Sequence, residues 1–252
     1  TLQKDGSSGT GIVAVRIGDA DKAVNMTTIS SSGAASTTFT VFENIDNFTG
    51  TLASVATGVA NGVTLNLAAA KAAGKTITGT GSGSVNVTAL DATLSADLSN
   101  VTVAAGGTLT GTFTASQEFA GNFGTAGMTV TISDGVTMTV AANKVDGSDG
   151  PTLQKDGSSG TGIVAVRIGT ADAAVDMTSI SSSGAASTTF TVFQTISNFT
   201  GTLAATTSVA ASQTLTLTAA KATGKTITGA AGGNGSVIVT ALDQTLDAVL
   251  DN

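Results

Sequence analysis

Short runs in which apolar and polar residues alternate follow one another along the whole chain. In "TTFTV", "VTLNLA", "SVNVT" and "MTVTI", an apolar residue occupies every second position. A period of two, rich in β-branched residues, is typical of short strands with one buried face. Glycine, aspartate, asparagine and serine, which favour turns, separate these runs. The pattern predicts an all-β protein. Only "LAAAKAAG" (Leu67–Gly74) and its relatives could form a helical turn, which at eight residues is marginal.

The same phrases return at two periods. "TLQKDGSSGTGIVAVRIG" at 1–18 recurs unchanged at 152–169, a period of 151 residues. A fainter echo of "NGVTLNLAAAKAAG" in "DGVTMTVAANKVDG" indicates a basic unit of about 75 residues. The predicted organisation is a first unit at 1–74, a second unit at 75–151, a copy of the first at 152–224 and a partial copy of the second at 225–252. We therefore expect this chain to be a piece of a longer, processed protein in which the array continues.

Core composition distinguishes two all-β architectures. A sandwich of about 75 residues usually fills its core with large aromatic residues, but the chain has only nine phenylalanines among 252 residues. Stacked coils suit a core of Val, Ile, Leu, Ala and Thr, because each layer is buried by its neighbours. The sequence favours a β-solenoid-like repeat array, with tandem immunoglobulin-like β-sandwich domains as the alternative.

Comparison of the two long copies separates candidate core positions from surface positions. The copies keep apolar residues at spacings that suit inward-facing strand positions, and we expect these residues to be buried: Val24/Val175, Met26/Met177, Ile29/Ile180, Phe39/Phe190, Val41/Val192, Phe42/Phe193, Ile45/Ile196 and Phe48/Phe199. The positions that change are mostly charged: Asp19 becomes Thr170, Lys22 becomes Ala173, Glu43 becomes Gln194 and Asp46 becomes Ser197. A catalytic carboxylate pair is therefore hard to place in the duplicated part.

A Gly-Lys-Thr triplet occurs in "KAAGKTITGTGSGSVNV" (Lys71–Val87) and again in "KATGKTITGAAGGNGSVIV" (Lys221–Val239). A phosphate-binding loop needs a second glycine five positions before the glycine of the triplet, and a helix that begins after the lysine. Alanine stands at both of those earlier positions, Ala69 and Ala219, and a strand-like run follows each lysine. The triplets therefore predict turns between strands.

Composition excludes several kinds of chemistry. The chain has no Cys, His, Trp or Tyr, which removes thiolate and imidazole metal ligands, disulfides and the usual nucleophile–base pairs. Ten Lys and Arg spread through a chain of net charge −7 form no basic stripe, so nucleic acid is not expected as a partner. Charge-free stretches such as 101–117 are interrupted by Thr, Gly and Ser, and no membrane-spanning helix is expected.

Calcium is the cofactor that the available oxygen ligands could bind. In "KVDGSDGP" (Lys144–Pro151), Asp146 and Asp149 flank glycines and are the candidate ligands. An Asp-Gly turn is the alternative interpretation. The segment "GGNGSV" (Gly232–Val237) approaches a glycine-rich calcium repeat, but Val237 stands where the aspartate belongs.

The phrases "TVFENIDNFTGTLA" and "VTALDATLSADLSNVTVAAG", with few aromatic residues and no cysteine, resemble the repeat regions of bacterial surface-layer proteins and giant repetitive adhesins. The resemblance implies an exported, β-rich, self-associating scaffold at the cell surface, often dependent on calcium.

Three functions follow as hypotheses. The first is a structural segment of a repetitive extracellular protein that forms a lattice, filament or stalk with identical copies. The second is an adhesin-type module that binds glycan or ice through Thr-rich faces, for which the sequence offers these pairs: Thr38/Thr40, Thr76/Thr78, Thr129/Thr131 and Thr226/Thr228. The third, an enzyme such as a polysaccharide lyase, is disfavoured because the chain has only two arginines and no aromatic platform beyond phenylalanine. We therefore predict no catalytic residues.

Overall fold

The alternating runs form short β-strands, and helices are few, so the all-β prediction is confirmed. The computed structural model describes residues 2–3, 12–29, 31–32, 36–124, 127–147, 150–157, 160–180, 182–183, 187–230 and 233–242. The chain divides into two units, Thr1–Phe113 with Gly121–Val130, and Thr114–Ala120 with Thr131–Asn252. The predicted repeat boundaries remain predictions.

The strands of the first unit are short and their pairing is regular. They are β1 (Leu2–Gln3), β2 (Ile12–Ile17), β3 (Ser31–Ser32), β4 (Ser36–Val41), β5 (Ile45–Phe48), β6 (Thr57–Val59), β7 (Thr64–Ala68), β8 (Ile77–Gly79), β9 (Ser84–Thr88), β10 (Val101–Val103) and β11 (Leu109–Phe113). One sheet has the order β10-β8-β6-β4-β2, and in a second sheet β5, β7, β9 and β11 are successive neighbours. β1 pairs with β3. β13 (Thr129–Ile132) contains residues of both units.

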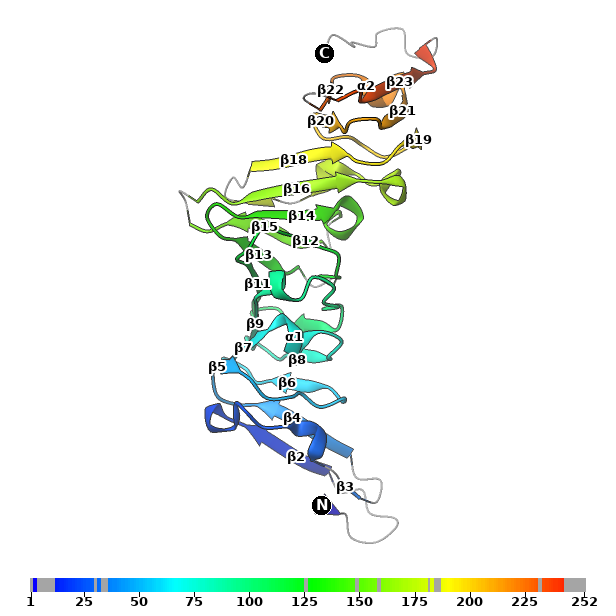
Figure 1. Cartoon of the computed structure of the whole chain (residues 1–252). Helices are drawn as coiled ribbons and strands as arrows, with labels where there is room; N and C mark the ends of the chain where they lie inside the picture. The colour runs from blue at the N-terminus through cyan, green and yellow to red at the C-terminus, as the bar shows by residue number, and fades with distance from the viewer. Residues whose placement is uncertain are drawn as a thin grey trace. The chain divides into compact units, whose positions relative to one another are not determined.

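The second unit repeats this arrangement (Figure 1). Its strands are β12 (Gln117–Phe119), β14 (Thr137–Ala141), β15 (Thr152–Lys155), β16 (Ile163–Ile168), β17 (Ser182–Ser183), β18 (Ser187–Val192), β19 (Ile196–Phe199), β20 (Thr206–Val209), β21 (Thr214–Thr218), β22 (Thr226–Gly229) and β23 (Ser236–Thr240). One sheet has the order β12-β14-β16-β18-β20-β22, another the order β19-β21-β23, and β15 pairs with β17.

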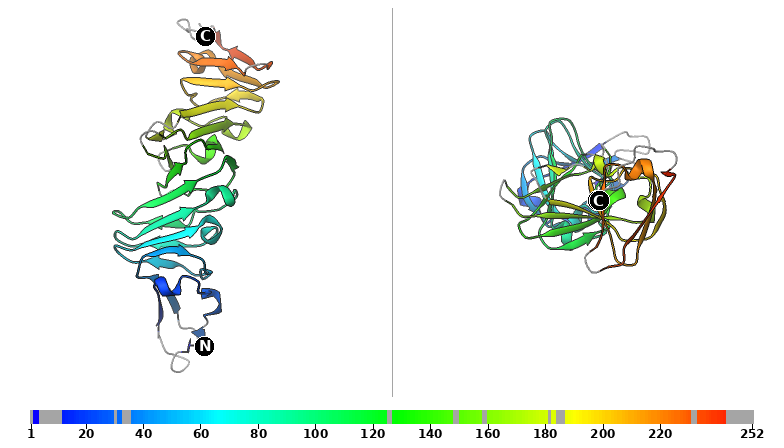
Figure 2. Two further views of the ribbon diagram at one scale, coloured as in Figure 1. Left: turned by 60° about the vertical axis from the view of Figure 1, so that its left-hand side comes forward. Right: turned by 90° about the horizontal axis from the view of Figure 1, so that it is seen from above.

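Every strand pair with a described register is parallel, and each pair joins a strand to the strand two further along the chain. Within each unit, the strands lie as successive layers in Figure 1 and in the left-hand view of Figure 2. Thr64 on β7 pairs with Ser84 on β9, and Ile12 on β2 pairs with Ser36 on β4. Immunoglobulin-like sandwiches are built from antiparallel sheets. Parallel pairing therefore removes that alternative.

The core of each unit is built from rows of apolar side chains that continue from one layer to the next. In the first unit, Leu65, Val85 and Leu109 are register partners on β7, β9 and β11, and their exposures are 0%, 0% and 3%. Alternate residues of a strand point to opposite faces, so the residues between them form polar outward rows. The period-two pattern is thus what places each side chain.

In the described part of the chain, helical structure is limited to single turns between strands. The α-helical turns are α1 (Ala69–Ala72) and α2 (Ala219–Ala222), both within the alanine-rich segment identified in the sequence. The 3₁₀ turns are η1 (Asp19–Asp21), η2 (Met26–Thr28), η3 (Leu90–Ala92), η4 (Ala142–Lys144), η5 (Thr170–Asp172) and η6 (Met177–Ser179). These turns redirect the chain between strands and place the loops considered below.

Most of the duplicated apolar positions are buried as predicted. Met26, Val41, Ile45 and Phe48 and their counterparts Met177, Val192, Ile196 and Phe199 belong to the core. The prediction is wrong for Val24, Ile29, Phe190, Phe42 and Phe193, which are only half-buried, and Phe42 and Phe193 have a common reason. Each ring follows the last residue of a strand and lies beneath an arginine guanidinium instead of entering the core.

Candidate functional site

The outward faces of the larger sheets carry rows of hydroxyl side chains. In the second unit, Arg167, Thr191, Ser208 and Thr228 are successive register partners on β16, β18, β20 and β22. Oγ1 of Thr191 and Oγ of Ser208 lie 2.9 Å apart. Adjacent parallel strands lie about 4.8 Å apart, so such a row has a fixed spacing.

The first unit has an equivalent row that begins at Arg16. Thr40, Gly58, Thr78 and Thr102 follow it on β4, β6, β8 and β10. The structure therefore brings Thr40 and Thr78 onto one row, but with a glycine between them. Thr129 and Thr131 lie on β13, which is not a strand of that sheet. The four predicted threonine pairs do not form one continuous surface.

Each row begins with an arginine that covers a phenylalanine ring. The guanidinium carbon lies 4.1 Å from the ring centroid for Arg16 and Phe42, and 3.8 Å for Arg167 and Phe193. Such a contact contributes about 0.5–1 kcal/mol at an exposed site. Arg167 also forms an ion pair with Glu118 on β12, with 2.6 Å between Nη1 and Oε2. The arginines kept in both copies thus have structural partners.

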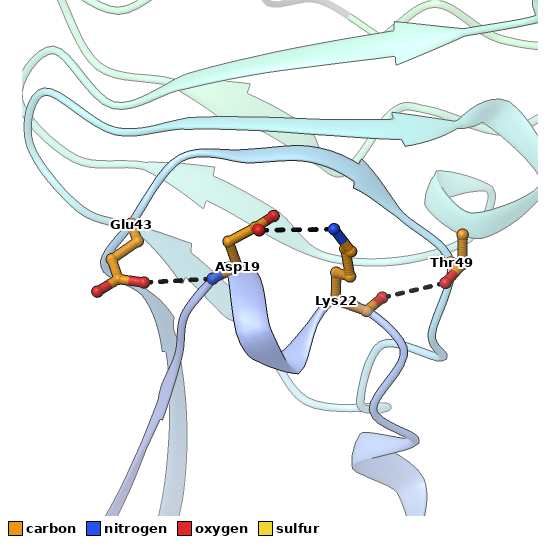
Figure 3. A network of polar contacts seen from close by, with 4 residues as sticks. All are labelled: Asp19, Lys22, Glu43 and Thr49. Carbon is orange, nitrogen blue, oxygen red and sulfur yellow. Dashed lines mark hydrogen bonds and ion pairs between the residues drawn. The ribbon is translucent and has the colours of Figure 1, made fainter.

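Glu43 belongs to a network at the turn that follows β2 (Figure 3). Its Oε2 accepts a hydrogen bond from the backbone N–H of Asp19 at 3.3 Å, and the ammonium group of Lys22 lies 3.5 Å from the Asp19 carboxylate. The hydroxyl of Thr49 donates to the carbonyl of Lys22 at 3.4 Å. All of these side chains except Thr49 change in the second copy, so the network needs no particular charge.

The second copy keeps the geometry with uncharged groups. Oε1 of Gln194, which stands in place of Glu43, accepts a hydrogen bond from the backbone N–H of Thr170 at 3.1 Å. An amide oxygen therefore replaces a carboxylate oxygen at the same acceptor position. This exchange indicates that Glu43 links two turns through its side-chain oxygen.

A second exchange occurs at the residue that caps the next turn. In the first copy, Oδ1 of Asn25 accepts hydrogen bonds from the backbone N–H and the hydroxyl of Thr27, at 3.1 and 2.7 Å. In the second copy, Asp176 accepts from Thr178 in the same way, at 2.9 and 2.6 Å. The side-chain hydrogen bond from Thr178, followed by its backbone N–H, lowers the pKa of Asp176 below 3.8.

Asp172 is a buried carboxylate that the sequence analysis did not single out. Its Oδ2 accepts from the backbone N–H of Gly169 at 2.7 Å, and its Oδ1 accepts from that of Asn143 at 2.9 Å. It therefore joins η5 to η4, a turn of the preceding layer. Asp21 occupies the same position in the first copy. The two copies keep an aspartate here although Asp19, two residues earlier, is replaced by threonine, and this difference could have identified Asp172 from the sequence.

Side chains in other turns also bind the next layer. In each case, a side-chain oxygen accepts a hydrogen bond from a backbone N–H about twenty or more residues away. The pairs are Asn44 with Thr64, Asn61 with Ser82, Ser116 with Thr137, and Asp134 with Thr161, at 2.8 to 2.9 Å. The polar residues between the strands therefore hold successive layers in register.

The Gly-Lys-Thr triplets form turns, as predicted. Gly74 and Gly224 adopt φ values of +66° and +69°, a conformation that favours glycine. The backbone N–H of Lys75 donates to the carbonyl of Ala72 at 2.9 Å, and that of Lys225 to Ala222 at 3.0 Å. Each triplet follows a helical turn and leads into β8 or β22. Phosphate binding needs free N–H groups at a helix start, and these lysine N–H groups are already bonded.

The calcium prediction is not tested by the structure. Asp146 is half-buried and precedes Gly147, whose backbone N–H donates to Oγ of Ser179 at 2.9 Å. Asp149 and Gly232 lie outside the described residues. Within the described part of the chain, no group of three or more acidic side chains is placed to hold a metal ion.

Two shallow hollows occupy related positions in the two copies. One is lined by residues that include Met26, Phe39, Ala53 and Val55, and the other by residues that include Phe190, Thr206 and Ser208. One includes Thr37 and Phe39 of β4 in its lining, and the other includes Thr188 and Phe190 of β18, which are the equivalent positions. Both are lined only by apolar and hydroxyl side chains.

No protein-family model, curated protein or solved structure matches this chain. Among the described residues, no helix is long and apolar enough to cross a membrane.

Proposed function

We propose that the chain is a structural segment of a repetitive extracellular surface protein. In this proposal it forms part of a β-solenoid array and assembles with identical copies into a lattice, filament or stalk. The resemblance to surface-layer and adhesin repeats supports a location at the cell surface.

The strand pairing supports a solenoid. A chain that pairs each strand with the strand two further along, always in parallel, winds in one direction with two main strands per coil. The register gives coils of 20 residues between Thr64 and Ser84 and 24 residues between Ile12 and Ser36. A unit of about 75 residues would then contain about three coils.

The structural role is supported above all by the polar side chains of the turns, which form hydrogen bonds between successive layers. Carboxylate, amide and hydroxyl oxygens at the turns accept hydrogen bonds from the next layer, and Glu43 can be exchanged for Gln194 without loss of the contact. A scaffold needs this kind of link between layers. We propose no enzymatic activity and no nucleic-acid partner.

Adhesion is a second candidate function, favoured by the hydroxyl row Thr191–Ser208–Thr228 on an outward face. A glycan could accept and donate hydrogen bonds along such a row. Thr228→Asp would abolish binding in a glycan array or an ice-affinity assay, whereas Thr214→Asp, on another sheet, would not. If the Thr228→Asp and Thr214→Asp variants bound glycan or ice equally well, the adhesion role would be rejected.

Assembly can be tested on the purified chain by electron microscopy and light scattering. Copies with a net charge of −7 repel one another, so association should strengthen with salt or with calcium and weaken with a chelator. A calcium requirement that salt cannot replace, lost in an Asp146→Asn variant, would support the predicted ligand. A monomer under every condition would contradict the structural proposal.

A further inference from the structure

The dipeptide Asn-Gly occurs twice in the sequence, at Asn61–Gly62 and at Asn234–Gly235. Glycine has no side chain to hinder its backbone nitrogen, so in this dipeptide the nitrogen can attack the carboxamide of the preceding asparagine. Asparagine is accordingly among the thermolabile residues. The first of these dipeptides lies in the turn between β6 and β7, with a described layer on each side of it.

Asn61 and Gly62 are the central residues of a β-turn. The backbone N–H of Val63 donates to the carbonyl of Ala60 at 3.1 Å, and Gly62 adopts a φ of +75°, as in a type II turn. Both central residues are exposed, and a Cβ on Gly62 would meet nothing within 4 Å. The N–H of Gly62 has no hydrogen-bond partner among the residues that the structure describes. The nitrogen that would attack is therefore open to water.

The carboxamide of Asn61, in contrast, is held by the next layer. Its Oδ1 accepts hydrogen bonds from the backbone N–H and the hydroxyl of Ser82, at 2.8 and 2.9 Å. Gly81 packs against the same oxygen so closely that a Cβ on Gly81 would overlap it. The carboxamide must leave these contacts before its Cγ can reach the nitrogen of Gly62. The contact between the two layers therefore opposes the reaction.

The second copy shows that the turn itself does not need Asn-Gly. Ala211 and Ser212 stand in place of Asn61 and Gly62, and the N–H of Gln213 donates to the carbonyl of Ala210 at 3.1 Å, as in the first copy. Ser212 adopts a φ of +61°, so a residue with a side chain keeps the left-handed conformation here. The reactive dipeptide can therefore be replaced without loss of the turn.

We propose that Asn61–Gly62 is a self-modification site that reacts only when the contact between Asn61 and Ser82 opens. The backbone nitrogen of Gly62 bonds to Cγ of Asn61, ammonia leaves, and a cyclic succinimide forms. Water then opens the ring at either carbonyl and gives aspartate or isoaspartate. The net change consumes one water, releases one ammonia and needs no oxidant or cofactor. This inference goes beyond the proposed function, because the reaction requires only the chain and water.

The two products differ in what they do to the layers. Aspartate keeps a side-chain oxygen at the position of Oδ1, so it can accept the hydrogen bonds from Ser82 again. Isoaspartate carries the main chain through the side-chain carbon, which lengthens the turn and displaces the acceptor. Isoaspartate at position 61 therefore records a separation of these two layers and prevents them from closing as before.

Mass spectrometry of the chain incubated at mildly alkaline pH tests this inference, with isoaspartate distinguished from aspartate by fragmentation. In urea, Asn61 and Asn234 should react at similar rates, because both precede glycine in an unfolded chain. In the folded chain, the rate at Asn61 should be at least about tenfold lower than in urea, since two hydrogen bonds must first break. Gly62→Ser, which copies Ser212, should slow the reaction in both conditions, because the added side chain hinders the nitrogen.

Ser82→Ala assigns the protection to the contact between layers. It removes the hydroxyl bond and leaves the backbone bond, so the rate at Asn61 in the folded chain should rise by about three- to tenfold. Ser116→Ala is the matched control, because it removes a similar bond to the N–H of Thr137 in the other unit and should leave the rate at Asn61 unchanged.

Equal rates at Asn61 in the folded chain and in urea would overturn the inference, as would a rate that Ser82→Ala does not change. An equal increase on Ser82→Ala and Ser116→Ala would assign the protection to overall stability and not to this contact. If Asn234 reacted in urea and Asn61 did not, Asn61–Gly62 would not be a modification site.

Discussion

Two threonine hydroxyls are enclosed in the inner rows of the sheets. Thr57 lies between Phe39 and Ile77 in register, and Thr207 is the partner of Ile227. Both residues are fully buried, and Oγ1 of each has no hydrogen-bond partner among the residues that the structure describes. Burying an unsatisfied hydroxyl costs about 1–3 kcal/mol. Thr57 and Thr207 are equivalent residues of the two copies, so both copies keep an unfavourable buried hydroxyl at the same position.

Replacing these threonines with an apolar residue of the same shape should stabilise the protein. We expect Thr57→Val and Thr207→Val each to raise the free energy of unfolding by about 1 kcal/mol in urea denaturation. Thr40→Val, on the outward row, is the matched control and should have little effect. A loss of stability on Thr57→Val would instead indicate that the hydroxyl binds an internal water molecule.

The cap at Asp176 makes one turn sensitive to acid. Its pKa is lowered in the folded state by hydrogen bonds from Thr178, so the ionised carboxylate stabilises the turn above pH 3.8. That contribution should disappear as the pH falls from 3.8 through the lowered pKa. Asp176→Asn, which copies Asn25, should reduce the loss of stability over this range. Asn25→Asp should introduce the same loss in the first copy, as measured by hydrogen exchange of each turn between pH 2.5 and 5. If acid destabilised the two variants equally, the assignment would be wrong.

At the scale of elements, one glycine in each copy is fixed by close approach between loops. A Cβ on Gly50 would lie 2.1 Å from the carbonyl oxygen of Val24, and one on Gly201 would lie 2.1 Å from that of Val175. Backbone atoms cannot move aside as a flexible side chain can. Gly50→Ala and Gly201→Ala should each lower the free energy of unfolding by roughly 1–3 kcal/mol.

The matched control for these glycines is Gly62. It adopts a φ of +75°, but a Cβ there would meet nothing within 4 Å. Gly62→Ala should therefore cost only the strain of a left-handed residue, about 1 kcal/mol. Thermal or urea unfolding distinguishes the two causes, and an equal cost at Gly50 and Gly62 would contradict the close-approach argument.

The positions of the strands could be predicted from the sequence, but the side-chain contacts between successive strands could not. Strand positions such as Leu65 and Leu67 follow from a local period of two, and the scarcity of large core residues favoured stacked coils over a sandwich. The arginine–phenylalanine contacts and the Asp172–Asn143 hydrogen bond depend on the register between layers, which no local pattern specifies. Phe42 was wrongly expected in the core because its contact with Arg16 could not be predicted from the local pattern. Comparison of the copies could have identified Asp21 and Asp172, since both were kept while a neighbouring charge was lost.

At the scale of the whole molecule, a stacked array should respond to damage locally. Each layer contacts only its neighbours, so stability is a sum of nearby contributions. Phe48 on β5 and Phe199 on β19 are equivalent residues, and each is 1% exposed. Truncating a buried phenylalanine to alanine costs about 3–5 kcal/mol.

Phe48→Ala should therefore accelerate hydrogen exchange in β5 and β7 and leave β19 and β21 unchanged. Phe199→Ala should do the reverse, so each variant is the control for the other. Exchange measured by mass spectrometry on peptides from both regions makes the comparison within one sample, and peptides that differ between the copies, such as those containing Glu43 or Gln194, identify the region. Because the core rows in each unit run between adjacent layers, the acceleration should decline with each layer away from the substitution. Uniform acceleration across both regions would require a single cooperative core and would contradict a layered array.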